Sequence, residues 1–364
     1  PEEPLVKGIY DYFEAAKASP EGEGWRGLVI GPSANGAQLE GSKAFSKKFM
    51  QRHNIPTAAY AEFTAENFDE GKKYIQQHTL PIVLKADGLA AGKGVVICTS
   101  HSEALACFDE MILHKQFGDA SIKVVIEEFL DGIEISVFAL TDGSDYKIIG
   151  HAKDYKRIGE GDTGPNTGGM GCVSPVPFAN KAFMKKAEEK IIKPTIKGLH
   201  DEGIVYKGFV FFGLINVNDE PYVIEYNCRM GDPETEVVMP RLKNDLMELF
   251  LALHNGTLAA QQIEFDERAC ATIVAVSAGY PGDYKKNFPV YFPPSLEGQG
   301  DAFIFHAGTK QTDDGVVTNG GRVLAISSYG ENISQAADAS KKILQQIHFD
   351  GMYYRKDIGY EFGG

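Results

Sequence analysis

The chain has 364 residues, with 36 Lys and Arg against 50 Asp and Glu, which gives a formal net charge of −14. This acidic balance disfavours nucleic acid as the main partner, because phosphates are bound by basic surfaces. A hydrophobic content of 43% is that of an ordinary globular protein, and no apolar stretch approaches the length needed to span a membrane.

The cysteines indicate the redox compartment. They are dispersed and odd in number, and none forms a CxxC pair, so we expect free thiols in a reducing environment. The opening residues carry no signal-peptide pattern. The sequence therefore predicts a cytoplasmic protein with five unpaired thiols, at Cys98, Cys107, Cys172, Cys228 and Cys270.

The N-terminal part predicts helices over 6–18 and 42–53 and a short buried strand over 28–30. Ser42 is the expected N-cap of the second helix. Further along, strands are predicted over 82–85 and 94–98, joined by a glycine-rich loop. A helix is then predicted over 102–115, with Ser102 as its cap.

The loop 88–94 resembles a P-loop but departs from it in two ways. It has one residue too few between its glycines, and no hydroxyl residue follows its lysine. We reject that motif and keep its physics, because flexible glycines allow backbone N–H groups to close on a phosphate. Lys85 ends an apolar strand, where a cation needs a partner, and a phosphate would serve. Two solvated lysines, Lys85 and Lys93, are the alternative.

Two strands are predicted over 123–130 and 134–141, around a turn at Asp131. Glu127 and Glu128 are adjacent, so their side chains leave opposite faces of the strand and one should face the interior. A carboxylate there could accept the amino hydrogens of an adenine, and Glu134 could accept from ribose hydroxyls. An acidic surface hairpin is the alternative.

A cationic stretch, 153–157, precedes a long glycine loop that runs to residue 171. Its GxGxxG match at 159–164 lacks the strand before it and the helix after it, so a dinucleotide fold is not indicated. The functional interpretation is a phosphate clamp beside a loop that orders over substrate. The alternative is an irregular surface loop.

A helix is predicted over 181–200, followed by a β-hairpin with strands over 209–217 and 222–227. Glu225 and Asn227 are two residues apart on a strand, so their side chains leave one face. Two oxygen ligands on one face suit a hard cation such as Mg²⁺, which shares nucleotide phosphates. Arg229 continues the row and could bind a carboxylate or phosphate.

The C-terminal part follows a predicted helix over 241–255 that Gly256 closes. The pattern then changes to short strands and one final helix, which indicates a separate module. Strand pairs mixed with helices favour an α+β (mixed α/β) fold. The predicted elements of the module are strands over 272–278, 302–306 and 322–328 and a helix over 333–347.

These motifs, in this order, resemble the ATP-grasp superfamily and, within it, the phosphoribosylamine–glycine ligase family. The resemblance covers essentially the whole chain and rests on residues 38–43, 84–94, 127–132, 165–171, 225–235 and 355–359. It implies an ATP-grasp fold over 41–255 with a flexible lid at about 57–127. It also implies a remnant of an N-terminal pre-ATP-grasp domain over 1–40 and a small α+β domain over 256–364.

The resemblance also implies a role for each matching residue. ATP phosphates would contact Lys43, Lys85, Gly92 and Lys93. Adenine would be held by the hinge Glu127, Glu128, Phe129 and Leu130, and ribose by Glu134. Arg157 and Asn166 would complete the nucleotide site. Mg²⁺ or Mn²⁺ would bind Glu225 and Asn227. Arg229, Asp232 and the loop over 166–171 would border the glycine and acyl-phosphate site, and the catalytic residues would be Arg157, Arg229 and Asp232.

The implied reaction joins glycine to 5-phosphoribosylamine through a glycyl phosphate, with release of ADP and phosphate, in purine biosynthesis. We expect these small molecules as partners and ATP with a divalent metal as cofactors. We expect a monomer without an obligate protein partner, nucleic acid or membrane. Another ATP-grasp carboxylate–amine ligase and an incomplete, non-catalytic ATP-binding module remain alternatives.

Overall fold

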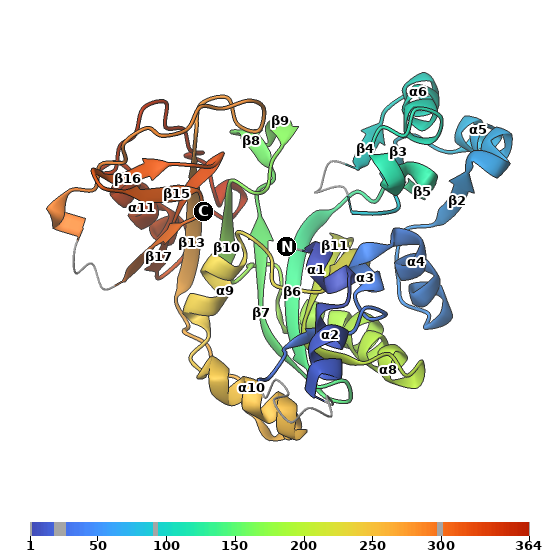
Figure 1. Cartoon of the computed structure of the whole chain (residues 1–364), viewed down its shortest axis with the longest axis horizontal. Helices are drawn as coiled ribbons and strands as arrows, with labels where there is room; N and C mark the ends of the chain where they lie inside the picture. The colour runs from blue at the N-terminus through green and yellow to red at the C-terminus, as the bar shows by residue number, and fades with distance from the viewer. Residues whose placement is uncertain (1, 18–26, 90–93, 297–300, 364) are drawn as a thin grey trace. The chain divides into compact units, whose positions relative to one another are not determined.

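The computed structural model describes residues 2–17, 27–89, 94–296 and 301–363 (Figure 1). The predicted phosphate-loop residues Gly92 and Lys93 lie outside these ranges. The chain forms two compact units, described separately below. Unit 1 comprises Pro1–Ile148, Asn180–Met230 and Asp245–Gln262; unit 2 comprises Ile149–Ala179, Gly231–Asn244 and Ile263–Gly364.

One sheet of unit 1 is built on the long strand β11 (Tyr206–Val217). It pairs antiparallel with β6 (Ile133–Thr141) on one side, and with β1 (Gly31–Pro32) and β12 (Glu220–Asn227) on the other. The turn between β11 and β12 has two residues with positive φ, Asn218 and Asp219. Such a turn matches the twist of a hairpin, and the predicted hairpin is confirmed.

A second sheet of unit 1 has the antiparallel order β2 (Tyr60–Thr64), β5 (Lys123–Glu128), β3 (Ile82–Ala86) and β4 (Val95–Cys98). Its apolar face packs with α5 (Phe68–Gln77) and α6 (His101–Ile112), which lie together in Figure 1. Because β5 and β6 belong to different sheets, the alternative of an acidic surface hairpin around Asp131 is wrong.

The remaining helices of unit 1 lie at or near the predicted positions, except two short ones, Glu2–Val6 and Gln38–Gly41, which the sequence patterns do not predict. The first predicted helix, over 6–18, begins only at Ile9, because Gly8, at φ 82°, separates it from a preceding short helix. The predicted helix over 181–200 contains a turn of π-helix over Glu188–Ile192. These helices are α1 (Glu2–Val6), α2 (Ile9–Lys17), α3 (Gln38–Gly41), α4 (Lys43–Arg52), α7 (Lys181–Ala187), α8 (Lys193–Asp201) and α10 (Leu246–Asn255).

The sheet of unit 2 has the order β7, β10, β13, β17 and β14. Helix α11 (Ile333–Leu344) packs on it, and its buried side chains share a core with strand residues such as Ile273 and Leu324. Two small hairpins, β8–β9 and β15–β16, complete the unit with α9 (Thr235–Arg241). The strands are β7 (Tyr146–Asp154), β8 (Arg157–Gly159), β9 (Thr163–Asn166), β10 (Gly171–Ser174), β13 (Ala269–Val276), β14 (Ala302–His306), β15 (Thr309–Thr312), β16 (Gly315–Thr318) and β17 (Arg322–Gly330).

Three local predictions are wrong. The strand expected at 28–30 lies at Gly31–Pro32, because only these residues find a partner on β11. Ser100, not Ser102, caps α6 by accepting the N–H of Glu103. The helix expected over 241–255 begins only at Leu246, because Arg241 ends an earlier helix and Asp245 accepts two backbone N–H groups at the start of the next, α10.

Other predictions are confirmed. Ser42 caps α4 by accepting the N–H of Phe45, and Gly256 closes α10 in the left-handed conformation. The mixed α/β fold class is also confirmed, since helices and antiparallel sheets alternate throughout the described residues. Within that part of the chain, no helix has the length and apolar character needed to cross a membrane.

Candidate active site

A buried cluster of two lysines and one carboxylate lies at the junction of α4, β3 and β5 in unit 1. Glu127 is only 3% exposed. Its Oε2 lies 2.9 Å from Nζ of Lys85 and 3.2 Å from Nζ of Lys47. Glu128, half-buried on the opposite face, accepts the N–H of Ala59. The prediction that one of the two adjacent carboxylates faces the interior is therefore confirmed.

The cluster carries a net positive charge, because one carboxylate faces two ammonium groups. Burial lowers the pKa of Lys47 to about 8, against the opposing charge of Glu127. Lys47 also donates to the hydroxyl of Thr57 at 2.8 Å. Among the residues that the structure describes, Oε1 of Glu127 has no hydrogen-bond partner although it is buried. A buried acceptor beside two lysines suits a ligand that brings both a phosphate and a donor group.

Lys43 is brought to this cluster by Asp87, the residue after β3. One oxygen of Asp87 accepts the N–H of Ala44 at 2.7 Å, and its backbone carbonyl accepts the N–H of Lys43 at 3.1 Å. The Ser42 hydroxyl also donates to the Asp87 carboxylate. Burial lowers the pKa of Lys43, while the charge of Glu225 opposes that shift. These bonds thus fix the first turn of α4 to the end of β3.

The predicted adenine hinge connects the two sheets of unit 1. Phe129, 38% exposed, and Leu130 follow the end of β5 and precede β6. Glu134 is half-buried near the start of β6 and pairs in register with Ile215 of β11. The hinge therefore joins the sheet that holds Lys85 to the sheet that holds Glu225. Its role in binding adenine and ribose stays a prediction.

The row of polar side chains on β12 lies as the spacing predicts. Glu225 and Asn227 are half-buried on one face, and Tyr226 is buried on the other, where its hydroxyl contacts Thr195. Arg229, just beyond the strand, lies 3.4 Å from Oδ1 of Asn227. Its guanidinium is also held by two carboxylates, at 2.7 Å from Glu2 and 3.0 Å from Glu40.

Glu225 and Asn227 fit a hard divalent cation by their chemistry. Both offer oxygen ligands from one face of the strand. The charge of Glu225 raises the pKa of Lys43 against the effect of burial, so Glu225 lies near the lysine cluster. Within the described ranges, no group of three or more His, Cys, Asp or Glu could hold a metal. The pair therefore suits Mg²⁺ or Mn²⁺, which take further ligands from water and phosphate, better than a structural metal with a full protein cage.

Two further predicted residues lie on the β8–β9 hairpin of unit 2. Arg157 and Asn166 are direct partners across the hairpin, and both are exposed. Nη1 of Arg157 donates to the carbonyl of Gly164 at 2.7 Å. The glycine loop that follows is held by side chains, since Gly168 donates its N–H to the hydroxyl of Tyr280 at 2.9 Å.

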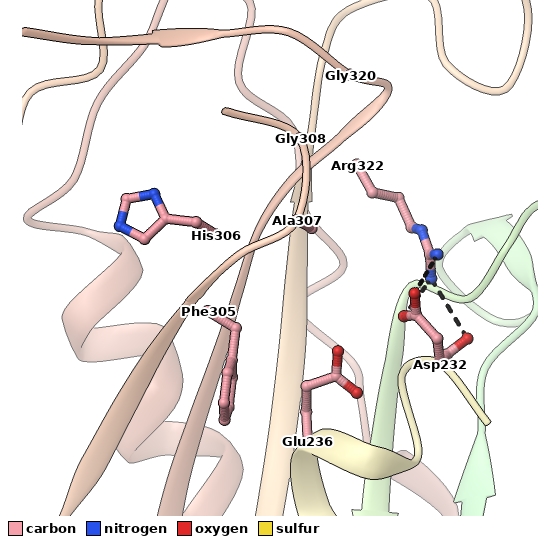
Figure 2. A pocket seen from close by; sticks show the side chains of 8 residues that line it. All are labelled: Asp232, Glu236, Phe305, His306, Ala307, Gly308, Gly320 and Arg322. Carbon is pink, nitrogen blue, oxygen red and sulfur yellow. Dashed lines mark hydrogen bonds and ion pairs between the residues drawn. The ribbon is translucent and has the colours of Figure 1, made fainter. Parts of the chain in front are cut away.

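Unit 2 also contains a cavity of about 470 Å³, shown in Figure 2. Arg322 and Asp232 face each other there in a two-pronged ion pair at 2.7 and 2.8 Å, and Arg322 also donates to the carbonyl of Gly168. Glu236 points into the cavity from the first turn of α9. The lining residues are Asp232, Glu236, Phe305, His306, Ala307, Gly308, Gly320 and Arg322.

Glu236 is the electrostatically unusual group of this cavity. Its Oε2 is buried and has no hydrogen-bond partner among the residues described. Burial and the charge of Asp232 raise its pKa from 4.5 to about 7, although Arg322 opposes the shift. A carboxyl group of this kind exchanges a proton near neutral pH and would gain a partner from a substrate amino group.

The predicted residues thus form two groups, one in each unit. Unit 1 holds Lys43, Lys85, Glu127, Glu128, Phe129, Leu130, Glu134, Glu225, Asn227 and Arg229. Unit 2 holds Arg157, Asn166 and Asp232. Four residues of these two sites are not predicted from the sequence: Lys47, Asp87, Glu236 and Arg322. Only Lys47 carried a usable signal, because its spacing from Ala44 and Met50 places it on the buried face of α4.

Known proteins resemble this chain over nearly its whole length. A family model described as "Phosphoribosylglycinamide synthetase, ATP-grasp (A) domain" matches residues 41–235, and one described as the C domain of the same synthetase matches residues 270–361. A phosphoribosylamine–glycine ligase from Escherichia coli is 46% identical over 362 residues, which are 99% of this chain and 82% of that protein. The same enzyme from Chlorobaculum tepidum is 45% identical over 360 residues, with the same coverage.

Solved structures agree with the sequence relatives. The phosphoribosylamine–glycine ligase of Thermotoga maritima has a TM-score of 0.82 and 35% identity, and the match covers 94% of this chain and 84% of that one. A biotin carboxylase from Campylobacter jejuni matches with a TM-score of 0.69 at 17% identity, over 91% of this chain and 72% of that one. At that identity the second likeness shows the fold alone.

Proposed function

The chain belongs to the phosphoribosylglycinamide synthetase family of ATP-grasp ligases, and from this we propose how its residues join glycine to 5-phosphoribosylamine with ATP. The products are glycinamide ribonucleotide, ADP and phosphate, and the step belongs to purine biosynthesis. The observation that carries the residue assignment is the buried cluster of Lys47, Lys85 and Glu127, which offers positive charge and an open acceptor.

The first chemical step transfers the γ-phosphoryl group of ATP to the glycine carboxylate. A carboxylate oxygen attacks phosphorus, the bond to the β–γ bridging oxygen breaks, and ADP leaves with that electron pair. The protein has little covalent work in such a step, so catalysis rests on positioning and on charge neutralisation. We assign Lys43 and Lys85 to the phosphates, and the hinge Glu127–Leu130 with Glu134 to the nucleoside.

The second step forms the C–N bond. The amine of phosphoribosylamine attacks the carbonyl carbon of the glycyl phosphate, phosphate leaves, and the nitrogen loses a proton. Because an acyl phosphate hydrolyses readily, the site has to exclude water between the two steps. We assign this task to the segment 57–127, which has a sheet and a core of its own.

The divalent metal belongs with the phosphates. Glu225 and Asn227 would hold Mg²⁺ or Mn²⁺, which supplies further neutralisation of phosphate charge when bound. In unit 2 we assign Asp232, Glu236 and Arg322 to the smaller substrates, because their cavity combines carboxyl groups with a guanidinium. Arg157 and Asn166 are assigned to the nucleotide. Arg229, beside the metal residues, is assigned to the glycine and acyl-phosphate site.

The proposal extends to the domain limits and to the cellular setting. We propose an ATP-grasp domain over 41–255 and a C-terminal domain over 256–364, and the ranges matched by the two family models support these limits. The five cysteines are free, which supports a reducing compartment such as the cytoplasm. We further propose that the chain acts as a monomer.

The test is coupled ADP release with Mg-ATP, in which glycine and phosphoribosylamine are omitted in turn. We expect ADP only when both are present. The variant Lys85→Met should abolish most of this activity, while Lys48→Met, a matched change at an exposed lysine of α4, should retain it. Turnover with another carboxylate in place of glycine would overturn the substrate assignment. ATP binding without any turnover would indicate a non-catalytic module.

A further inference from the structure

The segment after α11 makes a dense set of contacts with the β8–β9 hairpin of unit 2. Its central residue, Arg355, has a fully buried side chain. The guanidinium forms a two-pronged pair with Asp357, both contacts at 2.8 Å. Its Nη1 reaches the hairpin, at 2.6 Å from Oδ1 of Asp162 and 3.1 Å from the carbonyl of Arg157. One buried cation thus joins the start of β8 to the turn that follows the strand.

Further bonds fasten the same turn. The N–H of Gly161 donates to Oδ2 of Asp357 at 2.7 Å, and the hydroxyl of Tyr360 donates to Oδ2 of Asp162 at 3.0 Å. Upstream, the hydroxyl of Tyr353 donates to the carbonyl of Ile158 at 3.0 Å. We call residues 353–360 the C-terminal clasp. Its contacts reach Arg157 and Ile158 in β8 and Gly161 and Asp162 in the turn that connects β8 to β9.

The hairpin needs such support from outside. It has only three residues in β8 and four in β9, and a short two-stranded ribbon has little stability by itself. It projects beyond the end of β10 in Figure 1. Gly161 and Asp162 adopt positive φ, of 65° and 54°, so the turn needs a specific backbone conformation. The Arg355 contacts to Asp162 and to the Arg157 carbonyl hold that conformation.

We propose that Arg355 is a positioning residue that presets the hairpin on which Arg157 and Asn166 meet the nucleotide. The inference rests on the proposed function, because Arg157 and Asn166 are assigned to ATP there. Arg355 itself touches no substrate. The C-terminal clasp spares the hairpin the cost of ordering when ATP binds, since the conformation exists beforehand. Loss of Arg355 therefore acts on ATP through Arg157.

The experiment compares steady-state kinetics of Arg355→Met, Arg157→Met and the double variant, all in the full chain. We expect Arg355→Met to raise the KM for ATP about tenfold, with the KM for glycine changed less than about twofold. In the Arg157→Met background, the same change should raise the KM for ATP by less than about twofold, because the Arg157 side chain through which Arg355 acts is already absent. Arg355→Lys, which keeps the charge, should restore part of the loss.

Hydrogen exchange provides the structural readout. In Arg355→Met, amides of 157–164 should exchange faster, while those of the central strand β13 keep their protection. The control is Arg268→Met, which removes a two-pronged pair with Asp266 elsewhere in unit 2 and should leave the kinetics unchanged. If Arg355→Met fails to fold, Tyr360→Phe tests the same turn by removing one hydrogen bond, with an expected rise of about two- to threefold.

The outcomes separate the two proposals. A wild-type protein without ADP release overturns the proposed function. Wild-type kinetics of Arg157→Met, beside a loosened hairpin in Arg355→Met, overturn the positioning role while leaving the ligase activity intact. Equal losses from Arg355→Met in both backgrounds would show that Arg355 acts by general stability, and would also overturn the inference.

Discussion

At the scale of single residues, the buried pairing of Glu127 with two lysines is the most informative feature of unit 1. Breaking a buried ion pair leaves an uncompensated charge, which costs more than the pair contributes when intact. Here Glu127 faces both Lys47 and Lys85, so loss of one lysine leaves it a partner. In the proposed function the two lysines have different roles: Lys85 binds the ATP phosphates, whereas Lys47, which also donates to the Thr57 hydroxyl, orients the carboxylate.

The variant Lys47→Met tests this division. We expect a loss of about 1–3 kcal/mol in the free energy of unfolding, because Glu127 keeps Lys85 while α4 loses its tie to β5. The KM for ATP should rise by about three- to tenfold. Urea unfolding and steady-state kinetics measure the two effects. Lys48→Met, at a side chain 54% exposed, should change stability by less than about 0.5 kcal/mol. Equal effects of the two variants would contradict the expectation.

Glu236 predicts a pH dependence of stability. Its pKa is raised from 4.5 to about 7, so over that interval the folded state retains a proton that the unfolded state releases. The free energy of unfolding should therefore fall as pH rises through the interval and level off above it. In Glu236→Gln this contribution is absent, and the difference amounts to at most about 3 kcal/mol.

Urea unfolding at several pH values across this interval measures the effect. The control is Glu331→Gln, at an exposed glutamate of the same unit, which should follow the wild-type curve. A parallel pH dependence in Glu236→Gln and the wild type would show that Glu236 titrates normally in the folded protein.

At the scale of secondary-structure elements, helix caps decide which residues the site contains. Ser42 starts α4, and its hydroxyl also donates to Asp87, so the cap that begins the helix also fixes it to β3. The local pattern identified this cap but not its second partner. The local pattern places the cap of α6 two residues too late, because Ser100 and Ser102 are both reasonable caps and only the backbone conformation distinguishes them.

The two serines allow a direct test. Ser100→Ala should lower the free energy of unfolding by about 1 kcal/mol, since the N–H of Glu103 loses its acceptor. Ser102→Ala, at an exposed position one residue inside the helix, should stay within about 0.5 kcal/mol of the wild type. Urea unfolding of both variants provides the comparison, and a larger loss from Ser102→Ala would contradict the assignment of the cap.

At the scale of the whole molecule, the ligands link the residues to global stability. A ligand that binds only the folded state raises its stability by about 2.7 kcal/mol at a hundredfold excess over Kd. If Glu225 and Asn227 hold the metal, ATP should give this stabilisation fully only with Mg²⁺ or Mn²⁺ present. Glu225→Gln should weaken the metal-dependent part and leave the effect of ATP alone unchanged.

Thermal unfolding with ATP, with metal and with both measures this linkage. Glu248→Gln, at an exposed glutamate of α10, is the matched control and should respond as the wild type does. A stabilisation by ATP that is the same with and without metal in the wild type would contradict the assignment of Glu225 and Asn227.

The amino-acid sequence alone predicts the family, the mixed α/β class and the faces of the elements. Side chains alternate between the two faces of a strand and return to the same face of a helix about every 3.6 residues. Local spacing therefore already shows that Glu225 and Asn227 share a face and that Glu127 and Glu128 do not. Such periods describe a side chain's direction and carry no information on its partner.

Which side chains become partners depends on the tertiary fold. Lys47 meets Glu127 from 80 residues earlier in the chain, and Arg355 meets Asp162 from 193 residues later. The separation of β5 and β6 into different sheets has the same origin, because their strand partners lie elsewhere in the sequence. A buried charge is stable only beside its counter-charge, and which counter-charge arrives depends on how distant elements pack.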